Sequence, residues 1–120
     1  MTVEQSTRPR TSSVRVRTGR EALLNAAAAT MLQPVREIVC EPTRTQIVRA
    51  LSTGPLSVGD LASVLQRSKS ATSQHLRVLR DGGVVVPRRR GRSVFYSLVP
   101  SPMVNAAVQM LDRAAAVSAA

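Results

Sequence analysis

Side chains that form paired hydrogen bonds or attract anions gather in two short stretches of this chain. The first, residues 68–77, is rich in hydroxyl, amide and basic groups and contains no acidic residue. Glutamine can bind adenine, and arginine can bind guanine, through two hydrogen bonds each, whereas hydroxyls contact phosphates or base edges. We therefore expect this stretch to contact DNA through the following residues: Ser68, Lys69, Ser70, Thr72, Ser73, Gln74, His75 and Arg77.

The second stretch carries Arg88, Arg89, Arg90 and Arg92 around Gly91. Like charges this close repel one another unless an anion lies nearby, so a phosphate backbone or a narrow minor groove is their natural partner. The flanking residues 84–86 and 93–98 have strand-forming composition, and the glycine provides turn geometry. The sequence therefore predicts a basic two-stranded hairpin that also contacts DNA.

The overall charge favours the same partner. The chain has 17 Lys and Arg against 7 Asp and Glu, a formal net charge of +10, and every basic residue except Lys69 is arginine. The planar guanidinium suits phosphate oxygens and guanine edges better than an ammonium group does. The only aromatic residues are Phe95 and Tyr96, too few to stack successive bases of a single strand. Duplex DNA is therefore favoured over single-stranded nucleic acid and over an acidic membrane surface.

The sequence also argues against several other classes of protein. The single cysteine, Cys40, can form no disulfide within the chain, and no apolar run approaches the roughly 18 residues of a membrane span. One histidine and one cysteine, with no glycine-rich phosphate loop or paired carboxylates, provide no catalytic constellation, so we expect no enzyme. We expect a cytoplasmic protein with a disordered basic arm at residues 1–19 and one domain at residues 20–120.

Two apolar stripes with helical spacing lie near the two ends of that domain. The first consists of Leu24, Ala28, Met31, Val35 and Ile38, at alternating spacings of four and three. Pro34 interrupts it, which leaves open one kinked helix or two short helices that meet near Gln33. A last helix beginning at Pro102 carries the second stripe, which consists of Val104, Ala107, Val108, Leu111 and Ala115.

Three shorter helices are predicted between these stripes. Pro42 opens a helix that reaches about Ser52, and Ser57 with Asp60 forms a capping box for a helix over residues 58–66. Ser68 caps a helix over residues 69–81, which Gly82 and Gly83 end. Two short helices with a tight connection, followed by a basic hairpin, predict a mainly α (α+β) winged helix-turn-helix fold with a two-stranded wing.

Four ordered motifs carry a family resemblance: residues 41–44 (EPTR), 56–62 (LSVGDLA), 73–79 (SQHLRVL) and 90–98 (RGRSVFYSL). Together they resemble the ArsR/SmtB-type repressors over about residues 35–112. The resemblance implies a homodimer held by the first and last helices, with recognition helices in successive major grooves of an imperfect palindrome. The apolar stripes would then supply the dimer interface through these residues: Leu24, Ala28, Met31, Val104, Val108 and Leu111. The chain departs from the family at Gln66 and Arg67, where a glycine and an apolar residue are usual, and at Thr72.

The metal sites that the resemblance suggests lack their ligands here. Metal-sensing members carry cysteines beside the first helix of the motif, where this chain has Ser57 and Gly59, and the last helix offers only Asp112. We therefore expect no cofactor, no metal and a small effector of unknown identity. Cys40 is interpreted as a buried small apolar residue, and a thiol sensor near Arg36 or Arg44 is the alternative.

The sequence as a whole predicts a regulator of transcription that binds specific duplex DNA, a homodimeric repressor released by its effector. The alternative is an architectural protein that binds any duplex, because the basic arm and the hairpin provide non-specific affinity. His75 is interpreted as a packing or hydrogen-bonding residue at the DNA face rather than a metal ligand.

Overall fold

The computed structural model describes residues 12–23 and 26–119, and the chain divides into two units, Met1–Thr30 and Met31–Ala120. The first unit contains helix α1 (Ser12–Ala22), in which no residue is buried, and the first turn of α2. A disordered arm was expected at residues 1–19, but residues 12–19 belong to helix α1, where Arg15 and Arg17 have good helix propensity. Residues 1–11 lie outside the described residues.

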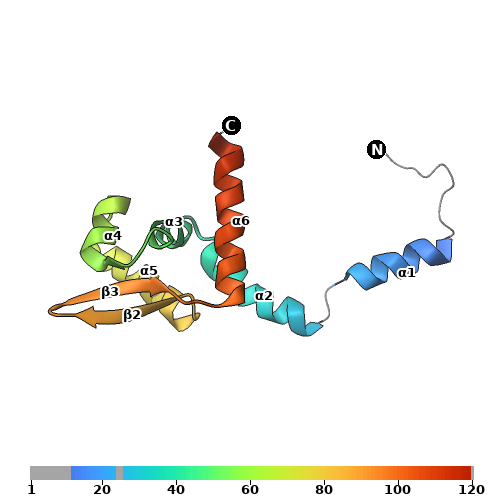
Figure 1. Cartoon of the computed structure of the whole chain (residues 1–120), viewed down its shortest axis with the longest axis horizontal. Helices are drawn as coiled ribbons and strands as arrows, with labels where there is room; N and C mark the ends of the chain where they lie inside the picture. The colour runs from blue at the N-terminus through green and yellow to red at the C-terminus, as the bar shows by residue number, and fades with distance from the viewer. Residues whose placement is uncertain (1–11, 24–25, 120) are drawn as a thin grey trace. The chain divides into compact units, whose positions relative to one another are not determined.

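The second unit contains the rest of the secondary structure (Figure 1). Helix α2 enters it at Met31, and the remaining elements follow in chain order. Their bounds are α2 (Ala26–Val39), α3 (Pro42–Leu51), β1 (Leu56–Ser57), α4 (Val58–Leu65), α5 (Lys69–Asp81), β2 (Val85–Arg90), β3 (Ser93–Leu98) and α6 (Pro102–Ala119). The predicted mainly helical fold with a β-hairpin is therefore confirmed.

The helix ends are set by the capping residues that the sequence indicated. Ser57 accepts the backbone N–H of Asp60 at 3.1 Å, and the Asp60 carboxylate accepts the N–H of Ser57 at 3.1 Å, which completes the capping box of α4. Ser68 caps α5 by accepting the N–H of Ala71 at 3.0 Å. At the other boundary left open by the sequence, α2 continues through Pro34 as one helix.

The sheet has three strands, not two. β3 is central and pairs antiparallel with β2 on one side and with the two-residue β1 on the other. Strand β1 has only two residues, too few to show an alternating pattern, so it was not predicted. Strand β2 is also longer than expected: it includes Arg88, Arg89 and Arg90, which leaves only Gly91 and Arg92 in the turn. Gly91 has φ +59°, the left-handed conformation that glycine adopts without strain.

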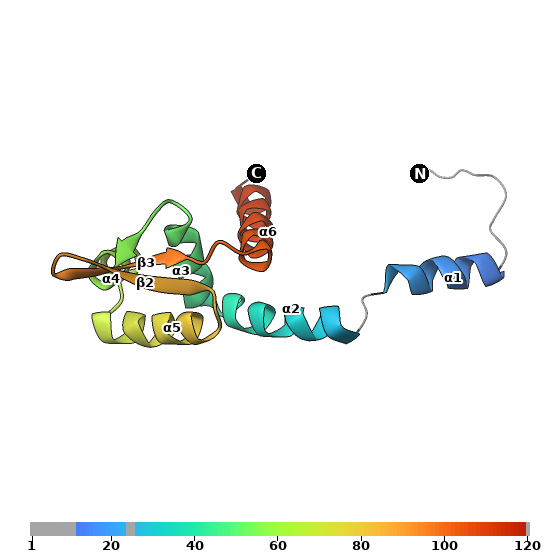
Figure 2. The ribbon, with the colours of Figure 1, turned by 60° about the horizontal axis from the view of Figure 1, so that its bottom comes forward.

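The core of the second unit lies around α3. Ile47 and Val48 of this helix are completely buried, together with Leu61 of α4 and with Leu76 and Leu79 of α5. Helix α3 contacts α4, α5, α6 and β3, so it is the element against which the others are placed. Helix α5 lies at the edge of the unit alongside β2, with one long side uncovered (Figure 2).

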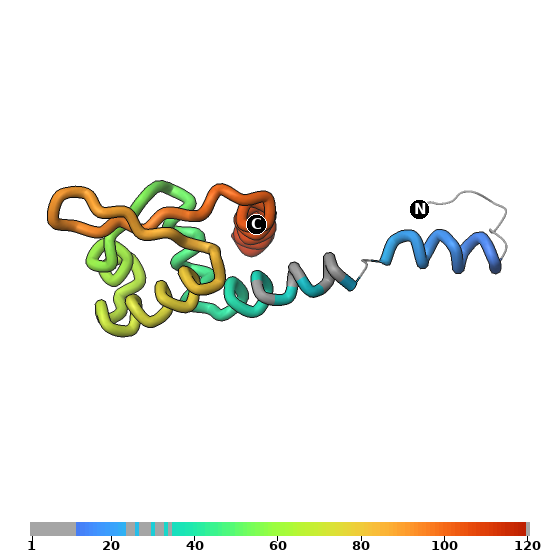
Figure 3. The backbone as a smooth tube through the Cα atoms, turned by 90° about the horizontal axis from the view of Figure 1, so that it is seen from below, coloured from blue at the N-terminus to red at the C-terminus, as the bar shows by residue number. Residues whose placement is uncertain are grey.

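The C-terminal end of α5 lies against the end of α2 (Figure 3). Gly82, the C-cap of α5, has an ordinary φ of −84°, so glycine is not needed there for its backbone. Its effect is on space, because a Cβ at this position would overlap Cδ1 at the flexible end of Ile38. A side chain at residue 82 would therefore require the partly exposed end of Ile38 to turn away.

Gly82→Ala should therefore lower the free energy of unfolding by about 1 kcal/mol, the low end for overpacking, because the end of Ile38 can turn away. Ile38→Val removes the clashing Cδ1, so Gly82→Ala should cost much less in the Ile38→Val background. Urea denaturation of the two single variants and the double variant measures this coupling. Equal costs of Gly82→Ala in both backgrounds would show that Ile38 and Gly82 do not meet.

Candidate nucleic-acid interface

Helix α5 has a buried stripe and an exposed stripe on opposite sides. Leu76 and Leu79 face the core with exposed fractions of 1% and 0%. Ser70, Gln74 and Arg77 follow one another at spacings of four and three, and all three are exposed. A helix spacing of 3.6 residues per turn places these polar residues on the side away from the core. The structure thus leaves an exposed row of hydroxyl, amide and guanidinium groups.

Thr72 is not part of this exposed row, which corrects its assignment as a DNA contact. Its exposed fraction is 0%, and its Oγ1 donates a hydrogen bond of 2.8 Å to the carbonyl of Ser68 in the preceding turn. The residue lies four positions before Leu76 and therefore belongs to the buried stripe. The hydroxyl is satisfied inside the helix, so Thr72 can be buried like an apolar residue.

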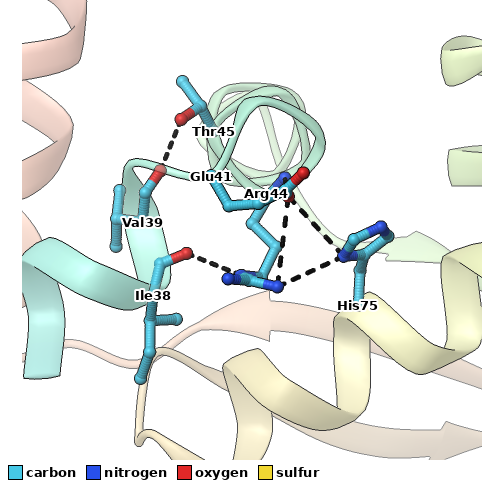
Figure 4. Close-up of polar contacts among 6 residues, drawn as sticks. All are labelled: Ile38, Val39, Glu41, Arg44, Thr45 and His75. Atoms are coloured by element: carbon cyan, nitrogen blue, oxygen red, sulfur yellow. Dashed lines mark hydrogen bonds and ion pairs between the residues drawn. The ribbon is translucent and has the colours of Figure 1, made fainter.

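His75 faces the start of α3, not the exposed side of α5 (Figure 4). Its Nδ1 lies 3.6 Å from Oε2 of Glu41 and 3.4 Å from Nη1 of Arg44, and its side chain is 26% exposed. The interpretation as a hydrogen-bonding residue agrees with these contacts. With Nδ1 turned toward α3, its assignment as a DNA contact stays a prediction.

Glu41 is the N-cap of α3 and the acidic member of this cluster. The backbone N–H of Arg44 donates to its Oε2 at 3.0 Å, and this hydrogen bond is the main reason why the pKa of Glu41 lies below its ordinary value. Partial burial opposes the shift, while the N–H of Thr43 and the charges of His75 and Arg44 add to it. The carboxylate form is therefore favoured in the folded protein.

The arginines of the hairpin lie on both faces of a strand. Arg88, Arg89 and Arg90 are exposed and pair in register with Phe95, Val94 and Ser93. Since side chains alternate along a strand, Arg88 and Arg90 share one face and Arg89 lies on the other. The guanidinium of Arg90 lies 5.6 Å from the centre of the Phe95 ring, a cation–π distance that orients it along the hairpin.

The turn between α4 and α5 adds a basic residue that the sequence reasoning missed. Gln66, the C-cap of α4, adopts a left-handed conformation with φ 55° and ψ 47°. This conformation reverses the chain and leaves Arg67 exposed immediately before Ser68, the N-cap of α5. An N-terminus of a helix attracts phosphate, so Arg67 joins the candidate interface. The position of Arg67 in the predicted turn was the feature of the sequence that could have identified it as a contact.

The last helix has two apolar stripes, and only one faces inward. Val104 is 3% exposed and belongs to the core of its own protomer, and Val108 and Leu111 pack against that core. The expectation that Val104 contacts a partner is therefore wrong. The outward stripe contains Met103, Met110, Ala114 and Val117, at spacings of seven, four and three, while Ala107 beside them is buried.

An apolar groove lies beside this outward stripe. It has a volume of about 230 Å³ and is lined by Val35 and Arg36 of α2 and by Met103, Ala106, Ala107 and Met110 of α6. Asp112 does not line the groove. Its Oδ1 lies 2.8 Å from Nη1 of Arg49, and this ion pair links α6 to α3. Of the residues predicted at the dimer interface on the first stripe, Leu24 lies outside the described residues, as do the side chains of Ala28 and Met31.

Cys40 is exposed, so the interpretation as a buried packing residue is wrong. It lies in the turn between α2 and α3, where its backbone N–H donates to the carbonyl of Arg36 at 3.0 Å and its side chain is directed to solvent. Within residues 12–23 and 26–119, no three His, Cys, Asp or Glu side chains are grouped to hold a metal ion. No helix of the same described part is long and apolar enough to cross a membrane.

Two helices joined by a tight turn, with the second exposed beside a basic hairpin, define a winged helix-turn-helix DNA-binding domain. Comparison with known proteins identifies its family. Residues 41–86 match the model of the bacterial regulatory protein, arsR family. The chain is 40% identical over 93 residues to the HTH-type transcriptional regulator NmtR of Mycobacterium tuberculosis. These 93 residues cover 78% of this chain and 74% of NmtR. The chain belongs to the ArsR family of transcriptional regulators.

Two further comparisons support the same assignment. The transcriptional repressor SdpR of Bacillus subtilis is 31% identical over 78 residues, which cover 65% of this chain and 87% of SdpR. The structure of HlyU from Vibrio cholerae superposes with a TM-score of 0.70 at 36% identity and covers 74% of this chain and 96% of HlyU. The winged helix-turn-helix fold and its role in DNA binding are thus shared with transcription regulators.

The lowered pKa of Glu41 gives a test at acid pH. A carboxylate whose pKa is depressed by folding stabilises the protein above its unfolded pKa, and this contribution is lost as the pH falls through the folded pKa. Glu41→Gln keeps an acceptor oxygen but does not titrate, so wild type should exceed it in free energy of unfolding above about pH 5 and lose this advantage as the pH falls through the lowered pKa of Glu41. Urea denaturation from neutral to acid pH measures the difference. A difference that does not change with pH would contradict the role of the carboxylate.

Proposed function

We propose that this chain is a homodimeric repressor of transcription that reads an imperfectly palindromic duplex with α5. The observation that carries the proposal is the exposed row of Ser70, Gln74 and Arg77, opposite the stripe that α5 buries in the core. This row lets the helix lie in a major groove with its amide and guanidinium groups toward base edges. Repression is supported by the naming of several relatives, among them SdpR, as repressors.

The residues around this row are suited to holding the DNA backbone. Lys69, Ser73 and Arg67 flank it and are exposed. The hairpin adds basic side chains on both faces, which can follow the phosphates on either side of a groove or enter a minor groove. In this arrangement Gln74 and Arg77 provide sequence discrimination, while the turn and the hairpin provide affinity for any duplex.

A second copy of the chain is the partner that the outward stripe of α6 fits. This stripe has spacings of seven, four and three, with which two helices pack, and Met110 on it is 53% exposed. A two-fold axis between two such helices would relate two copies of α5, and a two-fold pair of recognition helices reads a palindrome. The neighbouring groove of about 230 Å³ would be filled by the partner's side chains.

Two candidate signals could release the protein from its DNA. Cys40 is exposed, and access to solvent is what thiol oxidation requires, so an oxidant is one candidate signal. A small effector bound at the dimer interface is the other. Operator release by peroxide that Cys40→Ser abolishes would assign the signal to the thiol.

Gln74→Ala and Arg77→Ala should each reduce the discrimination between operator and random duplex by about 1–3 kcal/mol, because each removes a paired contact with a base. The operator for this test is the duplex that the wild-type protein selects from a random library, and fluorescence anisotropy measures both affinities. Arg89→Gln is the matched control, since loss of a phosphate contact weakens both duplexes equally and lowers the salt dependence.

Two outcomes would contradict this assignment. Equal weakening of operator and random duplex by Gln74→Ala and Arg77→Ala would place base reading elsewhere. A wild-type protein that fails to distinguish the two duplexes would favour the architectural alternative, in which the protein binds DNA regardless of sequence.

Met110→Glu should convert the dimer to monomers, because an unpaired charge buried in an apolar interface costs about 3–5 kcal/mol. Dimerisation should therefore weaken by on the order of 100-fold or more, with a parallel loss of operator affinity. Sedimentation equilibrium measures the association, and Asn105→Glu is the control because Asn105 is exposed but lies off the outward stripe. An intact Met110→Glu dimer would remove α6 from the interface.

A further inference from the structure

The end of α2 holds the recognition helix at two separate points. At the C-terminal end of α5, Ile38 packs against Gly82, where a Cβ would overlap the Cδ1 of Ile38. Near the middle of α5, the contact is polar and passes through Arg44. The Arg44 Nε donates to the carbonyl of Ile38 at 2.7 Å, while its Nη1 lies 3.4 Å from Nδ1 of His75 (Figure 4).

Glu41 completes the polar contact on the other side of the ring. Its Oε2 lies 3.6 Å from the same Nδ1 of His75 and 4.0 Å from Nη1 of Arg44, and it is itself fixed as the N-cap of α3. A neutral ring can accept at Nδ1 from the guanidinium, and a protonated ring can donate from Nδ1 to the carboxylate. The two groups that face the ring therefore provide a partner in either charge state.

The position of His75 on α5 gives this contact a particular consequence. His75 lies on the flank of the helix, between the buried stripe and the exposed row, and it directly follows Gln74. Apolar packing is non-directional, so Leu76 and Leu79 favour burial of one side of α5 without setting its rotation closely. Hydrogen bonds and ion pairs are directional, and on the flank they resist rotation about the helix axis.

The rotation matters because base recognition tolerates little misalignment. A rotation of about 10° moves the end of a side chain about 6 Å from the helix axis by about 1 Å. Paired hydrogen bonds to a base edge require positions within about 0.5 Å and angles within about 10–20°. A small loss of rotational restraint would therefore weaken the paired contacts of Gln74 and Arg77 while contacts with phosphates persist.

We propose that His75 is a positioning residue for base recognition: its ring, seated against Glu41 and Arg44, fixes the rotation of α5 and thereby the direction of Gln74 and Arg77. The inference rests on the proposed reading of bases by α5. It assigns to His75 no contact with DNA. Arg44 joins the Ile38 carbonyl at the end of α2 to the ring of His75 on α5. A change in the dimer that moves the end of α2 would therefore reach α5 through Arg44.

The test compares discrimination between operator and random duplex with stability in the same full-length variants. His75→Ala should lower the discrimination about tenfold, as the loss of one paired base contact does, with the salt dependence unchanged. His75→Asn places an amide near the position of Nδ1 and should recover most of the discrimination. Urea denaturation of each variant reports its stability, and all affinities are measured where every variant is folded.

Thr45→Val is the matched control for a purely structural role. The Oγ1 of Thr45 donates to the carbonyl of Val39, so it joins α3 to the end of α2 as Arg44 does, but it is not among the partners of His75 (Figure 4). The substitution preserves shape and removes that hydrogen bond. It should lower stability and leave the discrimination at the wild-type value.

A double-variant cycle gives the decisive comparison. In the Gln74→Ala background, His75→Ala should cause a smaller loss of discrimination than it does alone, because one of the contacts that it positions is already absent. If His75→Ala is too unstable to measure, Arg44→Lys is used instead, since it retains the charge but lacks the fork that reaches both the Ile38 carbonyl and the ring.

The outcomes separate this inference from the function on which it rests. Discrimination that falls in Gln74→Ala but not in His75→Ala or Arg44→Lys overturns the positioning role and leaves the proposed function intact. An equal loss in Thr45→Val and His75→Ala also overturns it, because general destabilisation would then explain both. Absence of discrimination in the wild-type protein overturns the inference together with the proposed function.

Discussion

The burial of one stripe of α5 against α3 is the contact on which the rest of the structure depends. Thr72, Leu76 and Leu79 are each 0–1% exposed, and the two leucines belong to the same small core as Ile47 and Val48 of α3. Because a helix that buries one side exposes the other, this contact places the polar row of α5 in solvent. The hairpin, α4 and α6 are arranged around α3 as well, so the interface and the candidate dimer surface share one support.

The sequence predicted the parts of this arrangement that are fixed by local chemistry. Capping by Ser57, Asp60 and Ser68 determines where α4 and α5 begin, and each uses a side chain to satisfy a backbone N–H a few residues away. Such interactions act within three or four residues, so the sequence alone contains them. Gln66 shows the limit of the same reasoning, because the turn forms without the glycine that its left-handed backbone favours.

The residues that the sequence placed incorrectly are those whose surroundings come from distant parts of the chain. Thr72 has a polar side chain that is satisfied by a hydrogen bond within its own helix, and only the folded structure shows that it is buried. Val104 has the spacing of a helix interface, and that interface is with its own protomer. Cys40 is small and apolar enough for a core, but the turn between α2 and α3 leaves it exposed. For each of these residues, the sequence indicated a stripe or a turn but not which part of the chain would lie against it.

The central claim is that Arg77 of α5 reads a base in the major groove, and a modified operator tests it most directly. The N7 of a guanine is one of the two acceptors that an arginine fork binds there, and 7-deazaguanine lacks it. Replacing the guanine at the position where Arg77→Ala changes preference should weaken wild-type binding by about 1 kcal/mol and leave Arg77→Ala binding unchanged. Equal losses for the two proteins would contradict the claim.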